Sequence, residues 1–148
     1  MQINPDYNTA AYTIRSYQTG EIVIFEPTPT TQIDKSNAKP GNEQQRSNAT
    51  LLKLHNSFII TPEKLVQKWD VDNPHLLIKD HFLTIAQLKP ELVILGTGKK
   101  IHFPSAEDYL FLQQQGIGVE IMDTAAACRT YNFLVADGRN VAAGLFMI

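Results

Sequence analysis

The sequence predicts an α/β (α+β) fold in which an antiparallel sheet is stacked against a mixed, largely parallel sheet covered by helices. The first half of the chain contains only strand and turn patterns, whereas the second half alternates helix and strand patterns with short connections. The chain has 148 residues, 43% of them hydrophobic, so one core of ordinary size is feasible. We therefore expect a single domain spanning residues 1–148.

Short apolar runs predict the strands of the first half. Residues 12–26 contain two of them on either side of Gly20, and the second is the run from Ile22 to Phe25. Further strand patterns follow at 51–54, 58–60 and 65–69. Because no helix pattern separates these strands, we expect them to pair mainly antiparallel.

Residues 27–50 differ in composition from the segments on either side. Pro27, Pro29 and Pro40 interrupt a run of Thr, Asn, Gln, Ser and Lys that has almost nothing to bury. A segment of this composition gains too little from burial to offset the entropy of ordering it. We predict a mobile polar loop, with a functional lid as the alternative interpretation.

The second half begins with a helix and a buried strand. Apolar residues at helical spacing predict the helix, and they are Phe82, Ile85, Ala86 and Leu88. Pro90 ends this helix because it cannot continue the hydrogen-bond ladder. The apolar run Leu92–Leu95 then predicts a strand buried on both faces, ending at Gly96.

Two more helices and two more strands complete the chain. Ser105, with Asp108 three residues later, predicts a capping box at a helix start. The inward face of that helix is expected to comprise Ala106, Tyr109, Leu110 and Leu112. Gly116 is placed to end the helix in the left-handed conformation. A strand over 117–122, a helix from Asp123 to Gly138 and a strand over 141–147 follow.

Charge and composition exclude several classes of function. Thirteen basic against fifteen acidic side chains give a formal net charge of -2, which provides no electrostatic footprint for nucleic acid or an anionic membrane. No stretch approaches the roughly 20 apolar residues that span a bilayer. One cysteine forms no internal disulfide, and the opening residues resemble neither a secretory signal nor a mitochondrial leader. We expect a cytoplasmic protein without membrane insertion.

Unusual residues follow two strands of the second half, and we call this set the rim. The rim consists of Gly96, Thr97, Gly98, Lys99, Asp123 and Thr124. Because the carboxyl ends of parallel strands meet at one edge of a sheet, we expect its two parts to lie together. Glycine amides beside a lysine suit a small anion. A tight turn next to solvated lysines is the simpler interpretation.

The helix that begins at Asp123 carries three further candidates, which are Cys128, Arg129 and Asn132. Asp123 itself is expected to cap the helix, because a helix N-terminus lowers the pKa of a carboxyl group and disfavours a general base. Cys128 lies where the helix dipole and Arg129 could favour a thiolate, yet the alanines before it predict a buried, inert thiol. Asn132 is a mediocre helix former on the same face as Arg129, so we expect it to bond a neighbouring loop.

No complete catalytic or metal-binding pattern occurs in the sequence. The spacing of the histidines places no two of them on one helical face, and they are His55, His75, His81 and His102. The esterase elbow, the P-loop and the three-glycine dinucleotide fingerprint are all absent. We therefore predict no catalytic residue, no metal ligand and no cofactor.

Two motifs, over residues 91–98 and 119–134, together with Asp137-Gly138-Arg139, resemble the Mth-type domain family of unknown function. That family includes mitochondrial complex I assembly factor 3 and an adipogenesis-associated protein. The resemblance implies a three-layer β+β/α fold, and it brings no reaction with it. It places the family's signature at Gly96, Thr97, Gly98, Asp123, Thr124, Cys128, Asn132, Gly138 and Arg139.

Two functions are compatible with these observations. The first is a non-enzymatic helper or assembly-type protein that contacts other proteins, as the resemblance implies. The alternative is a small-molecule binding protein or enzyme that holds an anionic ligand in a crevice between the Gly96–Gly98 loop and the helix starting at Asp123. The alternative requires Asp123, Cys128 and Arg129 to face an open pocket together.

Overall fold

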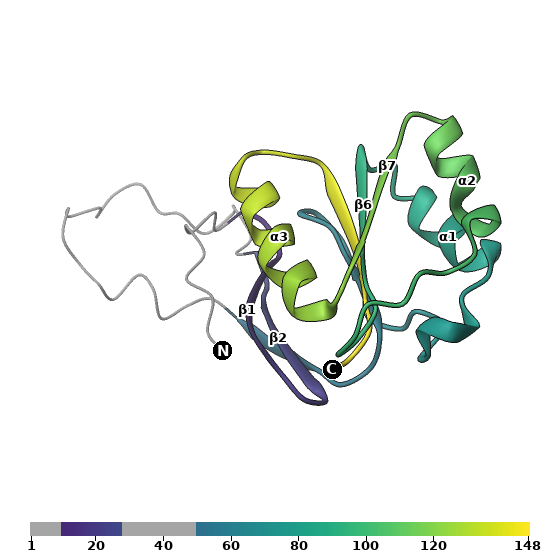
Figure 1. Ribbon diagram of the computed structural model, residues 1–148. Helices are drawn as coiled ribbons and strands as arrows, with labels where there is room; N and C mark the ends of the chain where they lie inside the picture. Colours follow the sequence, from purple (N-terminus) through teal and green to yellow (C-terminus); the bar gives the residue numbers. More distant parts are fainter. Residues whose placement is uncertain (1–9, 28–49) are drawn as a thin grey trace, which may run out of the picture.

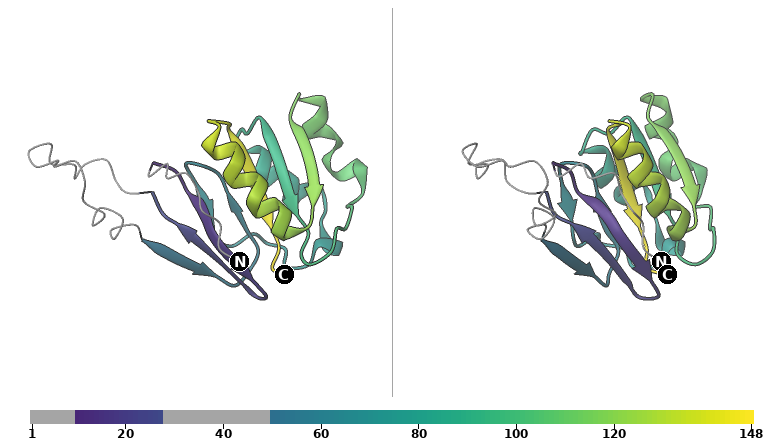
Figure 2. Two further views of the ribbon diagram at one scale, coloured as in Figure 1. Left: turned by 60° about the vertical axis from the view of Figure 1, so that its left-hand side comes forward. Right: turned by 90° about the vertical axis from the view of Figure 1, so that its left-hand side faces the viewer.

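The computed structural model describes residues 10–27 and 50–148, which form two sheets and three α-helices (Figure 1). The stretch at 27–50, predicted to be a mobile loop, lies almost entirely outside the described residues. In two further views the smaller sheet stands beside the larger one, and one helix lies on a face of the larger sheet next to the smaller sheet (Figure 2). The predicted arrangement of an antiparallel sheet against a mixed sheet with helices is confirmed.

The smaller sheet is antiparallel and has the order β1-β2-β3. Its strands are β1 (Thr13–Gln18), β2 (Glu21–Phe25) and β3 (Leu51–Leu54). The pairing of β1 with β2 shifts register between Ile14 and Ser16, so β1 carries a bulge there. At this bulge β1 is hydrogen-bonded to helix α3 (Thr124–Ala136).

The larger sheet is mixed and has the order β5-β4-β8-β6-β7. Its strands are β4 (Phe58–Ile60), β5 (Leu65–Val66), β6 (Leu92–Gly96), β7 (Gly118–Met122) and β8 (Val141–Leu145). Strand β6 runs parallel to both β7 and β8, whereas β4 runs antiparallel to β8 and β5. Successive residues of β4, β6 and β8 alternate between two hydrophobic clusters, so these strands are buried on both faces, as was predicted for β6.

Helices cover both faces of the larger sheet. Helix α3 (Thr124–Ala136) packs on β6 and β8 and also contacts β1 of the smaller sheet. Helices α1 (Lys79–Ala86) and α2 (Ala106–Gln114) pack against each other on the opposite side (Figure 1). A short 3-10 helix, η3 (Pro74–Leu76), precedes α1.

Several local predictions are confirmed and others need correction. Gly116 and Gly138 follow their helices with φ of 79° and 76°, as the left-handed position requires. The strand expected over 65–69 ends at Val66, and the Trp69 ring instead packs where Gly144 lacks a side chain. Leu88 lies beyond the end of α1.

The start and face of α2 also differ from the prediction. Ser105 is the N-cap, but its side chain makes no capping hydrogen bond, so the predicted capping box is wrong. Leu112 is fully buried, whereas Leu110 is 48% exposed and Ala106 is exposed. Because α2 packs only on α1 and on the edge strand β7, its buried stripe is narrower than the spacing suggested.

Candidate functional site

The two parts of the rim lie side by side at the carboxyl ends of β6 and β7. Gly96 ends β6 directly beside Met122, which ends β7. The backbone N–H of Thr97 then donates to the carbonyl of Met122 at 3.0 Å, which extends the parallel pairing one residue further. Their proximity follows from parallel pairing, as the sequence predicted.

Thr124 ties the two parts of the rim together. Its backbone N–H donates to the carbonyl of Gly98 at 2.9 Å, and its hydroxyl oxygen accepts from the Gly98 N–H at 2.7 Å. The same hydroxyl donates to the carbonyl of Phe146 at 2.7 Å, just beyond β8. Thr124 is fully buried, so each of these bonds replaces one that water would otherwise make.

The glycines and Thr97 complete this internal network. A Cβ at Gly96 would lie 2.8 Å from the Cβ of Ala127 and 3.0 Å from the Cα of Thr124, so only glycine lets α3 approach β6 this closely. Gly98 has φ of 99°. The Thr97 hydroxyl donates to the carbonyl of Lys100 at 2.8 Å and accepts from the N–H of His102 at 2.9 Å. The amides that could have bound an anion at Thr97 and Gly98 are therefore bonded within the protein.

Asp123 and Cys128 are both explained by the structure of α3. The Asp123 carboxylate accepts from the N–H of Ala126 at 2.8 Å, which is the predicted helix cap. Cys128 is fully buried in the core between the two sheets. Burial raises the pKa of its thiol to about 12, despite the opposing charge of Arg129. Cys128 is therefore a neutral core residue, and its burial disfavours a role as a nucleophile.

Arg129 and Asn132 fasten α3 to β1. The Asn132 amide accepts from the N–H of Ile14 at 2.8 Å and donates to the Ile14 carbonyl at 2.6 Å, so it pairs with the bulged strand as another strand would. One guanidinium nitrogen of Arg129 donates to the Tyr17 hydroxyl at 2.7 Å. The expectation that Asn132 bonds a neighbouring segment is correct, although that segment is a strand rather than a loop.

A shallow hollow of about 500 Å³ opens over part of the rim. It is lined by the turn between β1 and β2, by Gly98, Lys99, Asp123 and Ala125, and by Ile148. Three predicted site residues thus meet at one hollow. Cys128 and Asn132 lie in the protein interior, and Arg129 bonds to Tyr17. Asp123, Cys128 and Arg129 do not face an open pocket together, which is the condition that the enzyme hypothesis required.

Comparison with known proteins now identifies the family. A family model described as "Protein of unknown function (DUF498/DUF598)" matches residues 43–146, which is more than half of the chain. The chain belongs to this family. Its rim residues and its α3 motif lie within the matched segment.

Curated relatives of this DUF498/DUF598 chain carry two kinds of name. NADH dehydrogenase [ubiquinone] 1 alpha subcomplex assembly factor 3 of Rattus norvegicus is 36% identical over 88 residues, covering 58% of this chain and 47% of the rat protein. The "13 kDa major membrane protein" of Francisella tularensis is 31% identical over 86 residues, covering 57% of this chain and 70% of that protein. The chain spans about half the length of the assembly factors that it matches.

Solved structures confirm the fold that the resemblance implied. A crystal structure of a Bordetella parapertussis protein matches with a TM-score of 0.72 and 29% identity, over 96% of this chain and 100% of the other. A Bordetella pertussis protein described as a Mth938-like domain matches with a TM-score of 0.70 and 25% identity, over 99% and 92% of the two chains. The Mth-type resemblance inferred from the two motifs is correct.

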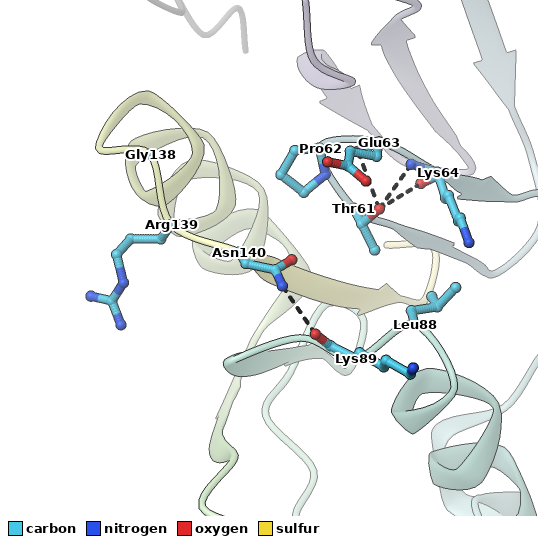
Figure 3. Close-up of a pocket in the computed structure, with 9 residues that line it drawn as sticks. All are labelled: Thr61, Pro62, Glu63, Lys64, Leu88, Lys89, Gly138, Arg139 and Asn140. Atoms are coloured by element: carbon cyan, nitrogen blue, oxygen red, sulfur yellow. Dashed lines mark hydrogen bonds between the residues drawn. The ribbon is translucent and has the colours of Figure 1, made fainter.

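A second hollow, of about 410 Å³, lies at the opposite edge of the larger sheet and was not predicted (Figure 3). Its lining includes Lys64, Lys89 and the signature residue Arg139. Figure 3 shows the Arg139 side chain extending away from both lysines. Its Nε donates to the Glu91 carboxylate at 2.6 Å, and this bond lowers the pKa of Glu91. The cations do not converge on one point, so we assign no ligand to this hollow.

Residues 10–27 and 50–148 contain neither a cluster of metal ligands nor a membrane-spanning helix. In this part of the chain, no group of three or more His, Cys, Asp or Glu side chains could hold a metal ion. His75 and His102 contact each other, with ring centroids 3.8 Å apart. Among the helices described, none is long and apolar enough to cross a membrane.

Proposed function

We propose that this chain is a non-enzymatic, assembly-type helper that acts through contacts with other proteins. The relatives named as assembly factors support the role. The observation that carries the proposal is the internal bonding of the rim, where Asp123 caps a helix, Thr124 joins strands and Cys128 is a buried thiol. Signature residues that build the fold itself are what a binding protein needs, whereas an enzyme needs groups free to meet a substrate.

We further propose that the helper works in the cytoplasm, beside a membrane. The single buried, reduced cysteine suits a reducing compartment. One relative is named as a membrane protein, which supports a location at a membrane. A helper of a membrane-bound assembly would benefit from a high local concentration there.

Capture of the chain from its native host tests the helper role. The tagged chain should recover the same partner subunits in every repeat, in a particle smaller than the finished assembly on native gels. A helper binds the incomplete assembly and then leaves it, because the surface of the assembly that it contacts is covered once the assembly is complete. Repeated captures without a partner would contradict the proposal, and so would a constant ratio to the finished assembly.

The anion-binding alternative keeps the hollow that Gly98, Lys99 and Asp123 line. An anion in this hollow could not bind the amides of Thr97 and Gly98, because they are bonded internally. It would also lie beside the Asp123 carboxylate, which lines the same hollow. Thermal melting in phosphate, sulfate and nucleotide, against chloride at matched ionic strength, measures it directly. A rise in the melting temperature for wild type that is absent in Lys99→Gln would support the alternative, and equal melting in all salts would remove it.

A further inference from the structure

Four large apolar side chains are exposed on two neighbouring connecting segments, and we call them the apolar loop patch. They are Leu76, Ile78, Ile101 and Phe103, exposed to 65%, 52%, 51% and 67%. Leu76 and Ile78 lie in η3 and at the start of α1, whereas Ile101 and Phe103 lie in the connection from β6 to α2. Side chains of this size rarely remain exposed in groups unless the surface meets something.

The two segments of the apolar loop patch are in contact. The His75 and His102 rings, one from each segment, lie 3.8 Å apart at their centroids. Each histidine stands next to patch residues in the sequence, so the contact brings together the two segments that carry the apolar pairs. In Figure 1 both segments run beneath α1 and α2.

Positive charge accompanies the apolar loop patch. Lys99 and Lys100 directly precede Ile101, whereas Lys79, which follows Ile78, lies with its ammonium 5.4 Å from the centroid of the Phe111 ring on α2. Segment 96–104 contains no acidic residue, whereas the exposed carboxylates of Asp72 and Asp80 directly flank segment 73–79. The positive charge of the patch therefore belongs to Lys99 and Lys100.

We propose that the apolar loop patch docks this protein on the surface of an anionic bilayer. Phe103, Ile101 and their neighbours enter the boundary between headgroups and acyl chains, while the lysines meet lipid phosphates. The inference rests on the proposed function in one respect, which is the location beside a membrane. It also revises the expectation from net charge, because a total of -2 averages away the local pair of lysines, Lys99 and Lys100.

The shape of the apolar loop patch favours a bilayer over a protein partner. Its four apolar side chains project from connecting segments, and none of them lines the hollow over the rim or the hollow beside Arg139. A fluid interface accepts separate projecting side chains without a matching surface, whereas a protein partner must supply a pocket for each one. Anionic headgroups complement Lys99 and Lys100.

Sedimentation with vesicles tests the proposal. Wild type is mixed with vesicles of phosphatidylcholine alone, or of phosphatidylcholine with an equal amount of phosphatidylglycerol. We expect binding to the anionic vesicles that weakens as salt is added. Phe103→Ser should weaken binding about tenfold through the lost apolar contact, and Lys99→Gln about fivefold through the lost charge.

Two control variants separate docking from general stickiness. Phe133 is 72% exposed on α3, far along the chain from the patch, so Phe133→Ser removes an equally exposed ring and should leave vesicle binding unchanged. Lys53→Gln on β3 is the matched control for Lys99→Gln. Melting temperatures near that of wild type establish that each variant is folded.

The outcomes separate this inference from the proposed function. No binding of wild type to anionic vesicles, or equal weakening by Phe133→Ser and Phe103→Ser, overturns the docking surface. If wild type fails to bind vesicles but Phe103→Ser loses partner subunits in the capture experiment, the patch is a protein contact and the helper role stands. If vesicles bind and capture recovers no partner, the docking surface stands and the helper role fails.

Discussion

The connection that follows β6 has two parts that the fold uses in opposite ways. Its first part, Gly96–Gly98, has Thr97 and Gly98 bonded to β7, α3 and the rest of the same connection. Its second part, Lys99–Phe103, presents two lysines and two large apolar side chains to solvent. In the sequence, the glycines, threonines and aspartate of the rim resemble a ligand-binding site. In the fold, their hydrogen bonds and close packing hold the structure together.

The two parts differ in whether their polar groups are hydrogen-bonded within the protein and in whether their apolar surface is buried. In the rim the polar groups find partners within the protein, so little remains for a ligand. In the apolar loop patch, apolar surface stays exposed to water, which leaves free energy available for an external contact. The rim should therefore respond to substitution through stability, and the patch through binding.

The largest effect that we expect is the low reactivity of Cys128. Its pKa of about 12 leaves only a trace of thiolate at pH 8, so alkylation of the folded protein should be about 10³-fold slower than that of free cysteine. Measurement of thiol alkylation by mass spectrometry, with and without denaturant, checks this. Rapid alkylation without denaturant would mean that solvent reaches Cys128 on α3. The rim would then no longer differ from the apolar loop patch in burial.

Next in size is the cost of adding one methyl group to the rim. In Gly96→Ala the new Cβ would meet Ala127, Leu145 and the backbone of Thr124, and overpacking of this kind should cost about 3 kcal/mol of unfolding free energy. Gly118→Ala is the matched control, because its new Cβ meets only the flexible end of Leu92. Denaturant unfolding of both variants checks it, and equal stability of the two would refute the close approach of α3.

A smaller loss is expected when the Thr124 hydroxyl is removed. Thr124→Val keeps the shape but withdraws the partner of the Gly98 N–H and of the Phe146 carbonyl, which should cost about 2 kcal/mol. Thr124→Ser retains the hydroxyl and should recover most of the stability. If Thr124→Val and Thr124→Ser unfold at the same denaturant concentration, the hydroxyl does not hold the rim together.

The smallest effect should come from the patch itself. Phe103 is 67% exposed, so Phe103→Ser should change the unfolding free energy by less than about 0.5 kcal/mol. The same variant should lose vesicle binding, which separates binding from stability in one protein. A loss of stability comparable to that of Thr124→Val would show that Phe103 is a packing residue, and the contrast between rim and patch would disappear.

Much of the fold could be predicted because its signals are local. The strand at Leu92–Gly96 is a short apolar run, and the left-handed residue at Gly116 follows from a helix ending. The errors arose where tertiary neighbours decide, as at Leu110, which finds no layer to cover it. Trp69 was predicted to end a strand, whereas its place depends on the missing side chain of Gly144, some 75 residues away.

By itself the sequence determined the elements, the family and the proximity of the two parts of the rim, because periodicity, caps and parallel pairing are encoded within short segments. Only the tertiary structure decided what those residues do. Whether Cys128 ionises depends on burial between two sheets, and the partner of Asn132 is a strand more than a hundred residues earlier. The contact of His75 with His102 likewise joins two unremarkable segments into one surface. Desolvation and contact between distant segments are properties of packing, which no local pattern contains.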